Sequence, residues 1–354
     1  MKIDKNELAK KIGQLKGIVP SKTTSEALRG VLYKDGYLIA SNTELTVKAK
    51  LEAEESNPDD RFIIPEKAFD LISNMPNGII ELIPTEGQLT IKMDKIKNVY
   101  NTVSPDEYTY QRNSILSDKM SVVSADKLRN AINHTLYAAA ITDPRVEMTG
   151  ICFECSNGKL EFVGLDGHRV AYDCIQCEGE FKFIIPRLAL NMIMKLDMEN
   201  DISITYDDYA ALFKCSDYEV YARLIAGEYF RWRAMMKDGP ITFTVDRKVF
   251  LEAINRVRLC STEKDKAPVL MEIQDNRIHI SFKNSATDYE EDVLLQMSIS
   301  EQIKIGFNPK LLIESLKSFE CENIVINMTG PKAPVTIKAD NSEMKALVLP
   351  VSIR

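Results

Sequence analysis

Four of the seven cysteines have a spacing that could hold a zinc ion. They form two Cys-x-x-Cys pairs, Cys152/Cys155 and Cys174/Cys177, with 18 residues between the pairs. Paired thiolates at this separation are common zinc ligands. However, residues 151–155 alternate as in a β-strand, so Cys152 and Cys155 would point to opposite faces of a sheet. We therefore expect all seven cysteines to be reduced and structural, with no metal and no other cofactor.

A second candidate for chemistry is the pair Asp166 and His168, separated by Gly167. In an enzyme, a carboxylate near an imidazole could act as a general acid and base. An Asp-Gly step more often forms a tight turn, and the chain contains only three histidines. We expect a turn here, no catalytic residues, and a protein that is not an enzyme.

The segments that must position these residues recur at an interval of about 121 residues. The run Phe-Ile-Ile-Pro at 62–65 returns at 183–186, and a weaker copy lies at 305–309. The run 107–112 likewise matches 228–233. In the first two copies a short apolar strand leads into apolar residues at helical spacing, and we expect the prolines in the first helical turn. A repeat this long indicates tandem domains and not a solenoid.

The repeat predicts an α+β fold of three tandem β-rich domains with two helices each. The domains are expected at 1–118, 119–240 and 241–354, with a polar linker at 113–120, and each has an ordinary domain size. Hairpin or turn signals lie at Lys34–Gly36, Ser156–Gly158 and Asp275-Asn276. The helices are expected at 1–19, 65–75, 125–140, 186–198, 246–260 and 308–319.

Composition and charge exclude several classes of protein. Apolar residues make up 45% and charged residues 27% of the 354 residues, which supports packed cores and argues against disorder. The N-terminus has no apolar signal region, and no apolar run approaches the length of a membrane span, so we expect a cytoplasmic protein. The net charge of −7 argues against general binding of nucleic acid but allows a local basic surface.

Several short runs are spread over the whole chain: Ser21–Thr24, Asn42–Leu45, Leu165–Ala171, Cys321–Asn323 and Leu347–Pro350. In these runs and in their order, the chain resembles one known family, the bacterial sliding clamp, which is the beta subunit of DNA polymerase III. In that family three such domains form half a ring, and two chains close head to tail into a six-domain ring that encloses duplex DNA. The resemblance implies a non-catalytic processivity factor that tethers the replicative polymerase.

The distribution of charge agrees with such a ring. Six helical windows together carry a formal charge of +6, against −13 for all other residues. Helices of this charge around a hole would attract phosphates without reading bases. The same basic residues could also be ordinary solvated helix faces. The windows are 5–19, 65–75, 125–140, 186–199, 246–260 and 308–318.

Clamps bind short peptide motifs of their partners in a groove between the second and third domains, and the resemblance implies such a groove here. Its apolar members suit Leu or Phe anchors of a peptide, although each alone could equally be plain core. Leu165, Phe230, Ala234 and Ser352 depart from the family pattern, so the preferred motif could differ. The expected pocket residues are Arg145, Met148, Leu165, Gly167, His168, Arg169, Val170, Phe230, Ala234, Met235, Leu311, Lys332, Pro334, Leu347, Leu349 and Val351.

The resemblance also implies partners and two further sets of residues. The partners are duplex DNA without sequence preference, the DNA polymerase III alpha subunit, the clamp loader, repair proteins and a second copy of the chain; no membrane is involved. Edge strands of the first and third domains are expected to close the dimer, with Val99 and Tyr100 facing Leu259 and Cys260 of the other chain. The expected DNA-facing residues are Lys16, Lys22, Arg187, Lys195 and Lys310.

Two alternatives remain at this point. The departures in the groove are compatible with a diverged clamp relative that acts as a protein-binding scaffold outside the main replicase. The four cysteines would also allow an enzyme with a metal site, which metal analysis of the purified protein would test.

Overall fold

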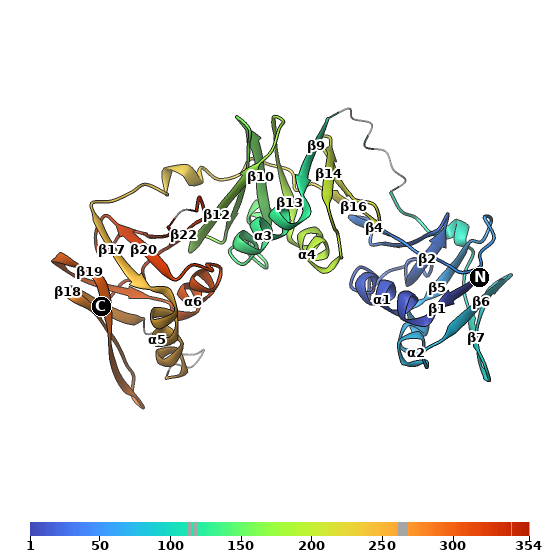
Figure 1. Cartoon of the computed structure of the whole chain (residues 1–354), viewed down its shortest axis with the longest axis horizontal. Helices are drawn as coiled ribbons and strands as arrows, with labels where there is room; N and C mark the ends of the chain where they lie inside the picture. Colours follow the sequence, from blue (N-terminus) through green and yellow to red (C-terminus); the bar gives the residue numbers. More distant parts are fainter. Residues whose placement is uncertain (112–114, 116–118, 261–267, 341, 354) are drawn as a thin grey trace. The chain divides into compact units, whose positions relative to one another are not determined.

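The computed structural model describes residues 1–111, 115, 119–260, 268–340 and 342–353. Within these residues the chain forms six α-helices and 22 β-strands (Figure 1), and the predicted α+β class is confirmed. The chain divides into two compact units. The first comprises Met1–Asp126 and Leu188–Leu224, and the second comprises Lys127–Arg187 and Ile225–Arg354.

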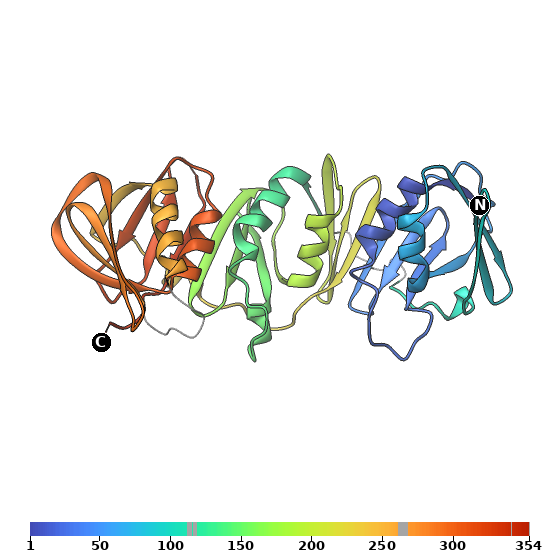
Figure 2. The same ribbon diagram turned by 90° about the horizontal axis from the view of Figure 1, so that it is seen from below.

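The first unit contains two antiparallel sheets. One has the strand order β1-β6-β7-β8, and the other has the order β5-β2-β3-β4-β16-β15-β14-β9. The helices α1 and α2 pack against each other (Figure 2). The elements are β1 (Lys2–Asp4), α1 (Lys5–Leu15), β2 (Gly30–Lys34), β3 (Tyr37–Ser41), β4 (Leu45–Lys50), β5 (Phe62–Pro65), α2 (Phe69–Asn74), β6 (Ile79–Thr85), β7 (Gln88–Met93), β8 (Ile96–Asn101), β9 (Met120–Ser124), β14 (Asp201–Tyr206), β15 (Ala210–Lys214) and β16 (Tyr218–Arg223).

The second unit contains an eight-stranded sheet with the order β13-β10-β11-β12-β22-β21-β20-β17, and a long hairpin, β18–β19. The helices α5 and α6 pack side by side (Figure 2) and share an apolar core with the strands around them. The elements are β10 (Gly150–Ser156), β11 (Lys159–Leu165), β12 (Arg169–Gln176), β13 (Phe181–Pro186), β17 (Ile241–Asp246), α5 (Arg247–Leu259), β18 (Val269–Lys283), β19 (Asp288–Phe307), α6 (Pro309–Lys317), β20 (Asn323–Met328), β21 (Val335–Ala339) and β22 (Lys345–Val348).

All six predicted helices are found, and each is shorter than expected. The remaining two, α3 (Ala125–Leu136) and α4 (Arg187–Lys195), begin near the points at which the chain passes from one unit to the other. The helix α1 begins where the Asp4 side chain accepts hydrogen bonds from the N–H groups of Asn6 and Glu7. In the described part of the chain, no helix is long and apolar enough to cross a membrane.

The prediction for two of the prolines is wrong. Pro65 and Pro186 are the last residues of β5 and β13, and each is the ladder partner of a glycine on the neighbouring strand. These strands lie at a sheet edge, where a proline without an N–H is tolerated. Only Pro309, of the three, lies in the first turn of its α-helix.

The turn predictions have mixed outcomes. The hairpins at Asp35-Gly36 and Asn157-Gly158 are confirmed, and all four residues have the positive φ angles that such turns require. The turn predicted at Asp275-Asn276 is wrong, because β18 continues through it. The register with β19 shifts there, and Asp275 has a φ of 54°, so the polar pair forms a β-bulge inside a long strand.

The two units do not follow the three predicted domains. Both eight-stranded sheets continue across a predicted boundary, because β4 pairs with β16 and β12 pairs with β22. As a result, the segment 119–240 is divided between the units. The boundary after residue 118, with much of the predicted linker, lies outside the described residues. The three-domain division therefore stays a prediction.

Candidate functional site

Of the runs that carry the resemblance, Leu165–Ala171 contains a tight turn between β11 and β12. The Asp166 side chain accepts hydrogen bonds from the N–H groups of His168 (3.0 Å) and Arg169 (3.1 Å), and Gly167 has a φ of +83°. A carboxylate that caps its own turn, followed by glycine in the left-handed region, is a stable arrangement. The predicted turn is therefore confirmed, and the Asp166 carboxylate is engaged by the backbone.

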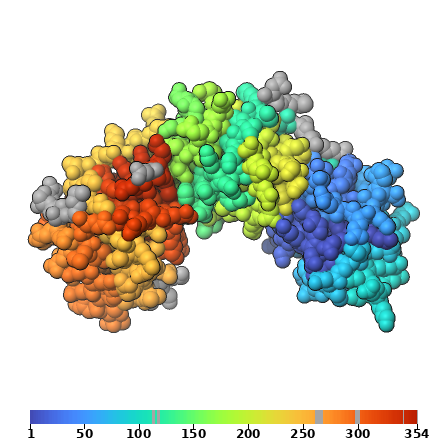
Figure 3. Space-filling model, in the orientation of Figure 1, coloured from blue at the N-terminus to red at the C-terminus, as the bar shows by residue number. Residues whose placement is uncertain are grey.

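The C-terminal segment lies directly beside this turn. The strand β22 pairs with β12, with Val170 opposite Leu347, and the N–H of Leu349 donates to the carbonyl of His168 at 2.9 Å. Further on, the N–H of Val351 donates to the carbonyl of Gly306 at 2.8 Å. The red C-terminal segments accordingly lie beside the green strands in the space-filling view (Figure 3). Two distant parts of the sequence are thus held in one surface region.

Arg169 fastens the turn to the helix α6. Its buried guanidinium donates from Nε to Asp166 (2.9 Å) and from Nη2 to the carbonyl of Tyr137 (2.8 Å), and Nη1 forms an ion pair with Glu314 on α6. A guanidinium with three different acceptors has its orientation fixed. Arg169 therefore supports the site from behind and does not offer a free positive charge on its surface.

Four of the expected pocket residues come together as one apolar wall. Met148, Leu165, Val170 and Leu347 are each at most 4% exposed and belong to a single buried cluster. Met148 lies in a short 3-10 helix, η3 (Val146–Thr149), and the others lie on β11, β12 and β22. Their burial means that they shape the floor of the region. The cluster also contains Ala140, Cys152, Val163, Tyr172, Ile184, Tyr229 and Trp232.

The other expected members differ in their exposure. Met235 is 49% exposed, Leu349 and Val351 are also exposed, and the Arg145 guanidinium lies 5.9 Å from the ring centre of Phe230. Ala234 and Lys332 are exposed, whereas Phe230, Leu311 and Pro334 are half-buried. The expected set therefore combines buried apolar residues with exposed ones, and whether they form a peptide groove stays a prediction.

Sequence reasoning missed two exposed apolar side chains next to the expected members. Val146 lies beside Arg145 at the start of η3, and Ile353 follows Leu349 and Val351 at intervals of two residues. Alternation along the C-terminal segment was the available signal for Ile353. The signal for Val146 was weaker, because a single apolar residue in a polar loop is common on protein surfaces.

The expected DNA-facing residues differ in their surroundings. Lys16, Lys22, Lys195 and Lys310 are exposed. Arg187 is half-buried, and its Nη1 donates to the carbonyl of Leu136, the last residue of α3, at 2.7 Å and to that of Ala139 at 2.8 Å. Because its guanidinium is engaged by the backbone, this position argues against Arg187 as a contact to phosphate.

The expected dimer residues also lie in different kinds of structure. Val99 and Tyr100 lie on β8, an edge strand of the four-stranded sheet. Leu259 is 80% exposed but is the last residue of α5, and Cys260 follows it as the helix cap. The expectation that all four lie on edge strands is therefore wrong for Leu259 and Cys260.

The first cysteine pair lies in a strand, as the alternation predicted. Cys152 and Cys155 are buried in β10, Cys174 lies in β12, and Cys177 follows the end of that strand. Burial raises the pKa of the Cys152 and Cys155 thiols to about 12. Protonated, buried thiols are poor metal ligands. In the described ranges, no group of three or more His, Cys, Asp or Glu residues could hold a metal ion.

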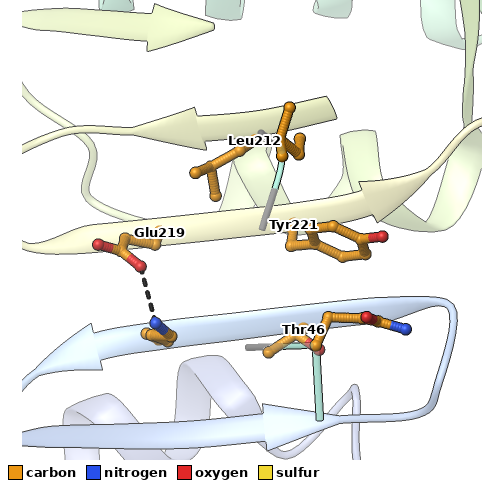
Figure 4. A pocket seen from close by; sticks show the side chains of 7 residues that line it. Thr46, Leu212, Glu219 and Tyr221 are labelled. Atoms are coloured by element: carbon orange, nitrogen blue, oxygen red, sulfur yellow. Dashed lines mark ion pairs between the residues drawn. The ribbon is translucent and has the colours of Figure 1, made fainter. Parts of the chain in front are cut away.

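A small polar cavity in the first unit marks the place where β4 joins β16 (Figure 4). Glu219 on β16 forms ion pairs with Lys48 (3.0 Å) and Lys214 (2.8 Å), and Leu212 and Tyr221 line the cavity beside it. Burial would raise the pKa of Glu219, but the two lysines outweigh it and hold the pKa below its ordinary value. The cavity of about 10 Å³ has room for about one water molecule, so we assign it a structural role.

Comparison of the sequence with known proteins identifies one family and relatives that match almost the whole chain. Family models of the DNA polymerase III beta subunit match residues 122–230 (central domain) and 233–352 (C-terminal domain). The beta sliding clamps of Halalkalibacterium halodurans and Bacillus subtilis are 25% and 24% identical to the chain, and both alignments cover 99% of it and 98% of the relative.

Solved structures support the same fold. A DNA polymerase III beta subunit from Thermotoga maritima superposes with a TM-score of 0.91 at 23% identity, covering 100% of this chain and 99% of the other. A sliding clamp from Pseudomonas aeruginosa, bound to griselimycin, superposes with a TM-score of 0.93 at 20% identity, with coverage of 100% and 99%.

Proposed function

The chain belongs to the DNA polymerase III beta subunit family, and we propose that two copies of it close a ring around duplex DNA and hold partner proteins in the groove beside the Asp166–His168 turn. It is a DNA sliding clamp, a non-catalytic processivity subunit that acts in DNA replication. Its partners are DNA, the replicative polymerase and other clamp-binding proteins. From the family we also infer a cytoplasmic location.

The proposed groove rests on one observation, the pairing of β12 with β22. It brings the turn, the apolar wall and the exposed residues Leu349 and Val351 into one region. Burying two apolar anchors of a peptide there would contribute roughly 3–6 kcal/mol before ordering costs. A site of this size suits weak, exchangeable contacts with several partners.

Removal of residues 349–354 tests the groove. We expect the truncated chain to lose calorimetric binding of a consensus clamp-binding peptide, because Leu349, Val351 and Ile353 are removed while β22 remains. The dimer, followed by sedimentation of the same sample, should persist because Tyr100 and Leu259 are untouched. Unchanged peptide affinity would place the groove elsewhere, and loss of the dimer would show that the C-terminal segment serves the ring.

We propose that Lys16, Lys22, Lys195 and Lys310 face the enclosed DNA. Their exposure supports this assignment, and such contacts are sequence-independent and strongly salt-dependent. Replacing any one with alanine should weaken binding modestly and equally for all DNA sequences, with a smaller slope of affinity against salt. Lys283→Ala, on an exposed hairpin, is the control.

We propose that the ring closes through Val99 and Tyr100 of one chain and Leu259 and Cys260 of the other. The exposed edge of β8 and the 80% exposure of Leu259 support this pairing. Light scattering should give a mass near twice 40.1 kDa for the unmodified chain. The double variant Tyr100→Asp, Leu259→Asp should be monomeric, and a dimeric double variant would exclude this interface.

One observation favours a second candidate function. Leu165, Phe230, Ala234 and Ser352 depart from the family pattern, and Leu165 belongs to the apolar wall while Phe230 packs against it. The chain could then serve as a clamp for partners other than the main replicase. Calorimetry with the peptide motif of the host's replicative polymerase, set against motifs of its other clamp-binding proteins, separates the two functions.

A further inference from the structure

Two carboxylates face each other on the eight-stranded sheet of the second unit. Glu154 on β10 and Glu161 on β11 are direct cross-strand partners, and both side chains are at most one-fifth exposed. Like charges directly opposite each other destabilise a sheet. Lys182 on β13, the other ladder neighbour of Glu154, lies 3.1 Å from it and balances only one of the two charges. The pair therefore needs a second cation.

Arg233 supplies that cation from a different element. It belongs to the short 3-10 helix η4 (Trp232–Ala234), which lies in the connection between β16 and β17. Its Nη1 lies 3.2 Å from each carboxylate oxygen of Glu154, and its Nη2 forms an ion pair with Glu161. One guanidinium thus joins both strands to the connection. We call Arg233, Glu154 and Glu161 the η4 latch.

Aromatic packing beside the latch holds the same connection. The buried Trp232 ring lies 5.0 Å from the ring of Tyr172, and the Arg233 guanidinium lies 4.5 Å from the centre of the Trp232 ring. The Tyr172 hydroxyl in turn lies 3.1 Å from Glu161. The connection is therefore fixed between a charged cluster and an apolar cluster, and loss of the cation would leave two carboxylates in mutual repulsion.

We propose that Arg233 is a positioning residue for the peptide groove. Two backbone hydrogen bonds link η4 to the expected groove residues Phe230 and Met235. The N–H of Trp232 donates to the carbonyl of Phe230 at 2.8 Å, and the N–H of Met235 donates to the carbonyl of Trp232. The Arg233 guanidinium is itself engaged by Glu154 and Glu161, so its effect on Phe230 and Met235 would pass through the backbone of η4. This inference rests on the proposed function of the groove.

The electrostatics of Glu154 agree with this arrangement. Burial alone would raise the pKa of its carboxyl, but the bonds from Arg233 and Lys182 outweigh burial and hold that pKa below its ordinary value. The carboxylate therefore stays charged and available to the latch near neutral pH.

The test compares Arg233→Met with the unmodified chain. Methionine keeps an apolar stem against Trp232 and removes the charge. We expect peptide affinity to fall by at most about tenfold, because the charge-assisted contact that is lost holds η4 and not the peptide. Trp232 is the only tryptophan in the chain, so its fluorescence reports directly on η4. We expect its emission to shift to longer wavelength and its quenching by acrylamide to increase.

Two further variants separate positioning from general stability. The triple variant Arg233→Met, Glu154→Gln, Glu161→Gln removes the repulsion and should regain part of the affinity and of the tryptophan emission. Arg256→Met is the matched control, because Arg256 is similarly exposed and also contacts a carboxylate, Glu291, through two nitrogens. It should leave both readouts unchanged.

The outcomes distinguish this inference from the proposed function. If the unmodified chain does not bind the peptide, the groove itself is overturned, and with it the role of Arg233. If the unmodified chain binds and Arg233→Met binds equally well, the groove stands and the positioning role is overturned. Loss of affinity in the control as well would show a general effect of lost surface charge and would also overturn it.

Discussion

Replacing Arg169 with alanine should destabilise the second unit more than any substitution of an exposed arginine. The guanidinium is 8% exposed and contacts Asp166, Glu314 and the carbonyl of Tyr137. Removing one member of a buried ion pair typically costs about 3–5 kcal/mol, because the other charge is left without a partner.

The surroundings of Arg169 reduce that figure. Asp166 keeps the hydrogen bonds from two backbone N–H groups, and the Glu314 side chain is 35% exposed, so water can replace part of the lost interaction. We therefore expect about 2–3 kcal/mol, at or below the lower end of that range. For a unit of this size, that corresponds to a fall of about 5–10 °C in the midpoint of thermal unfolding.

Scanning calorimetry and urea unfolding measure this loss, with two comparisons. Arg277→Ala removes an exposed arginine with one ion pair to Asp292 and should cost at most about 1 kcal/mol. Arg169→Lys should not restore stability, because an ammonium cannot reproduce the planar fork that reaches three acceptors. A loss below about 1 kcal/mol for Arg169→Ala, or full stability of Arg169→Lys, would refute the role assigned to this side chain.

Two further predictions concern the interior of each unit. Gly164→Ala should prevent stable folding of the second unit, because the added Cβ would lie 2.4 Å from the carbonyl oxygen of Thr135. Thermal unfolding followed by circular dichroism measures the loss of stability. A variant as stable as the unmodified chain would contradict the close approach. In the first unit, the pKa of Glu219 is lowered from its ordinary value of 4.5. Its ion pairs with Lys48 and Lys214 therefore stabilise the fold at pH values above 4.5, and this stabilisation is lost as the pH falls through the lowered pKa. The difference in unfolding free energy between the unmodified chain and Glu219→Gln should therefore narrow from pH 7 to pH 3, and a constant difference would argue against the pairing.

The sequence predicted most of the elements because its apolar periodicity was regular. The helical spacing of Leu8, Ile12 and Leu15 corresponds to the buried face of α1, and the alternation in 151–155 corresponds to β10. Where the sequence misled, a local signal was outweighed by tertiary structure. Asp275-Asn276 has turn chemistry, but the pairing of β18 with β19 accommodates it as a bulge.

The site could be located by resemblance but not resolved into its parts. Sequence alone does not distinguish a buried wall from an exposed rim, so Met148 and Met235 looked equivalent although one is 3% and the other 49% exposed. The network behind the site was also hidden. Arg169 and Glu314 are 145 residues apart, and only the sheet that joins β12 to β22 brings α6 to the turn.

The repeated Phe-Ile-Ile-Pro run depends on a close contact with the neighbouring strand, and the run alone does not reveal that contact. Gly30 pairs with Pro65, and Gly150 pairs with Pro186 in the equivalent place of the next repeat. A Cβ on Gly30 would lie 2.5 Å from the carbonyl oxygen of Ile64 and 2.8 Å from the side chain of Ile63. A Cβ on Gly150 would lie at the same distances from Ile185 and Ile184. Both strands can approach the edge strand so closely only with glycine there. The Phe-Ile-Ile-Pro run is therefore half of a two-strand unit, and its other half is a single glycine that no sequence pattern would single out.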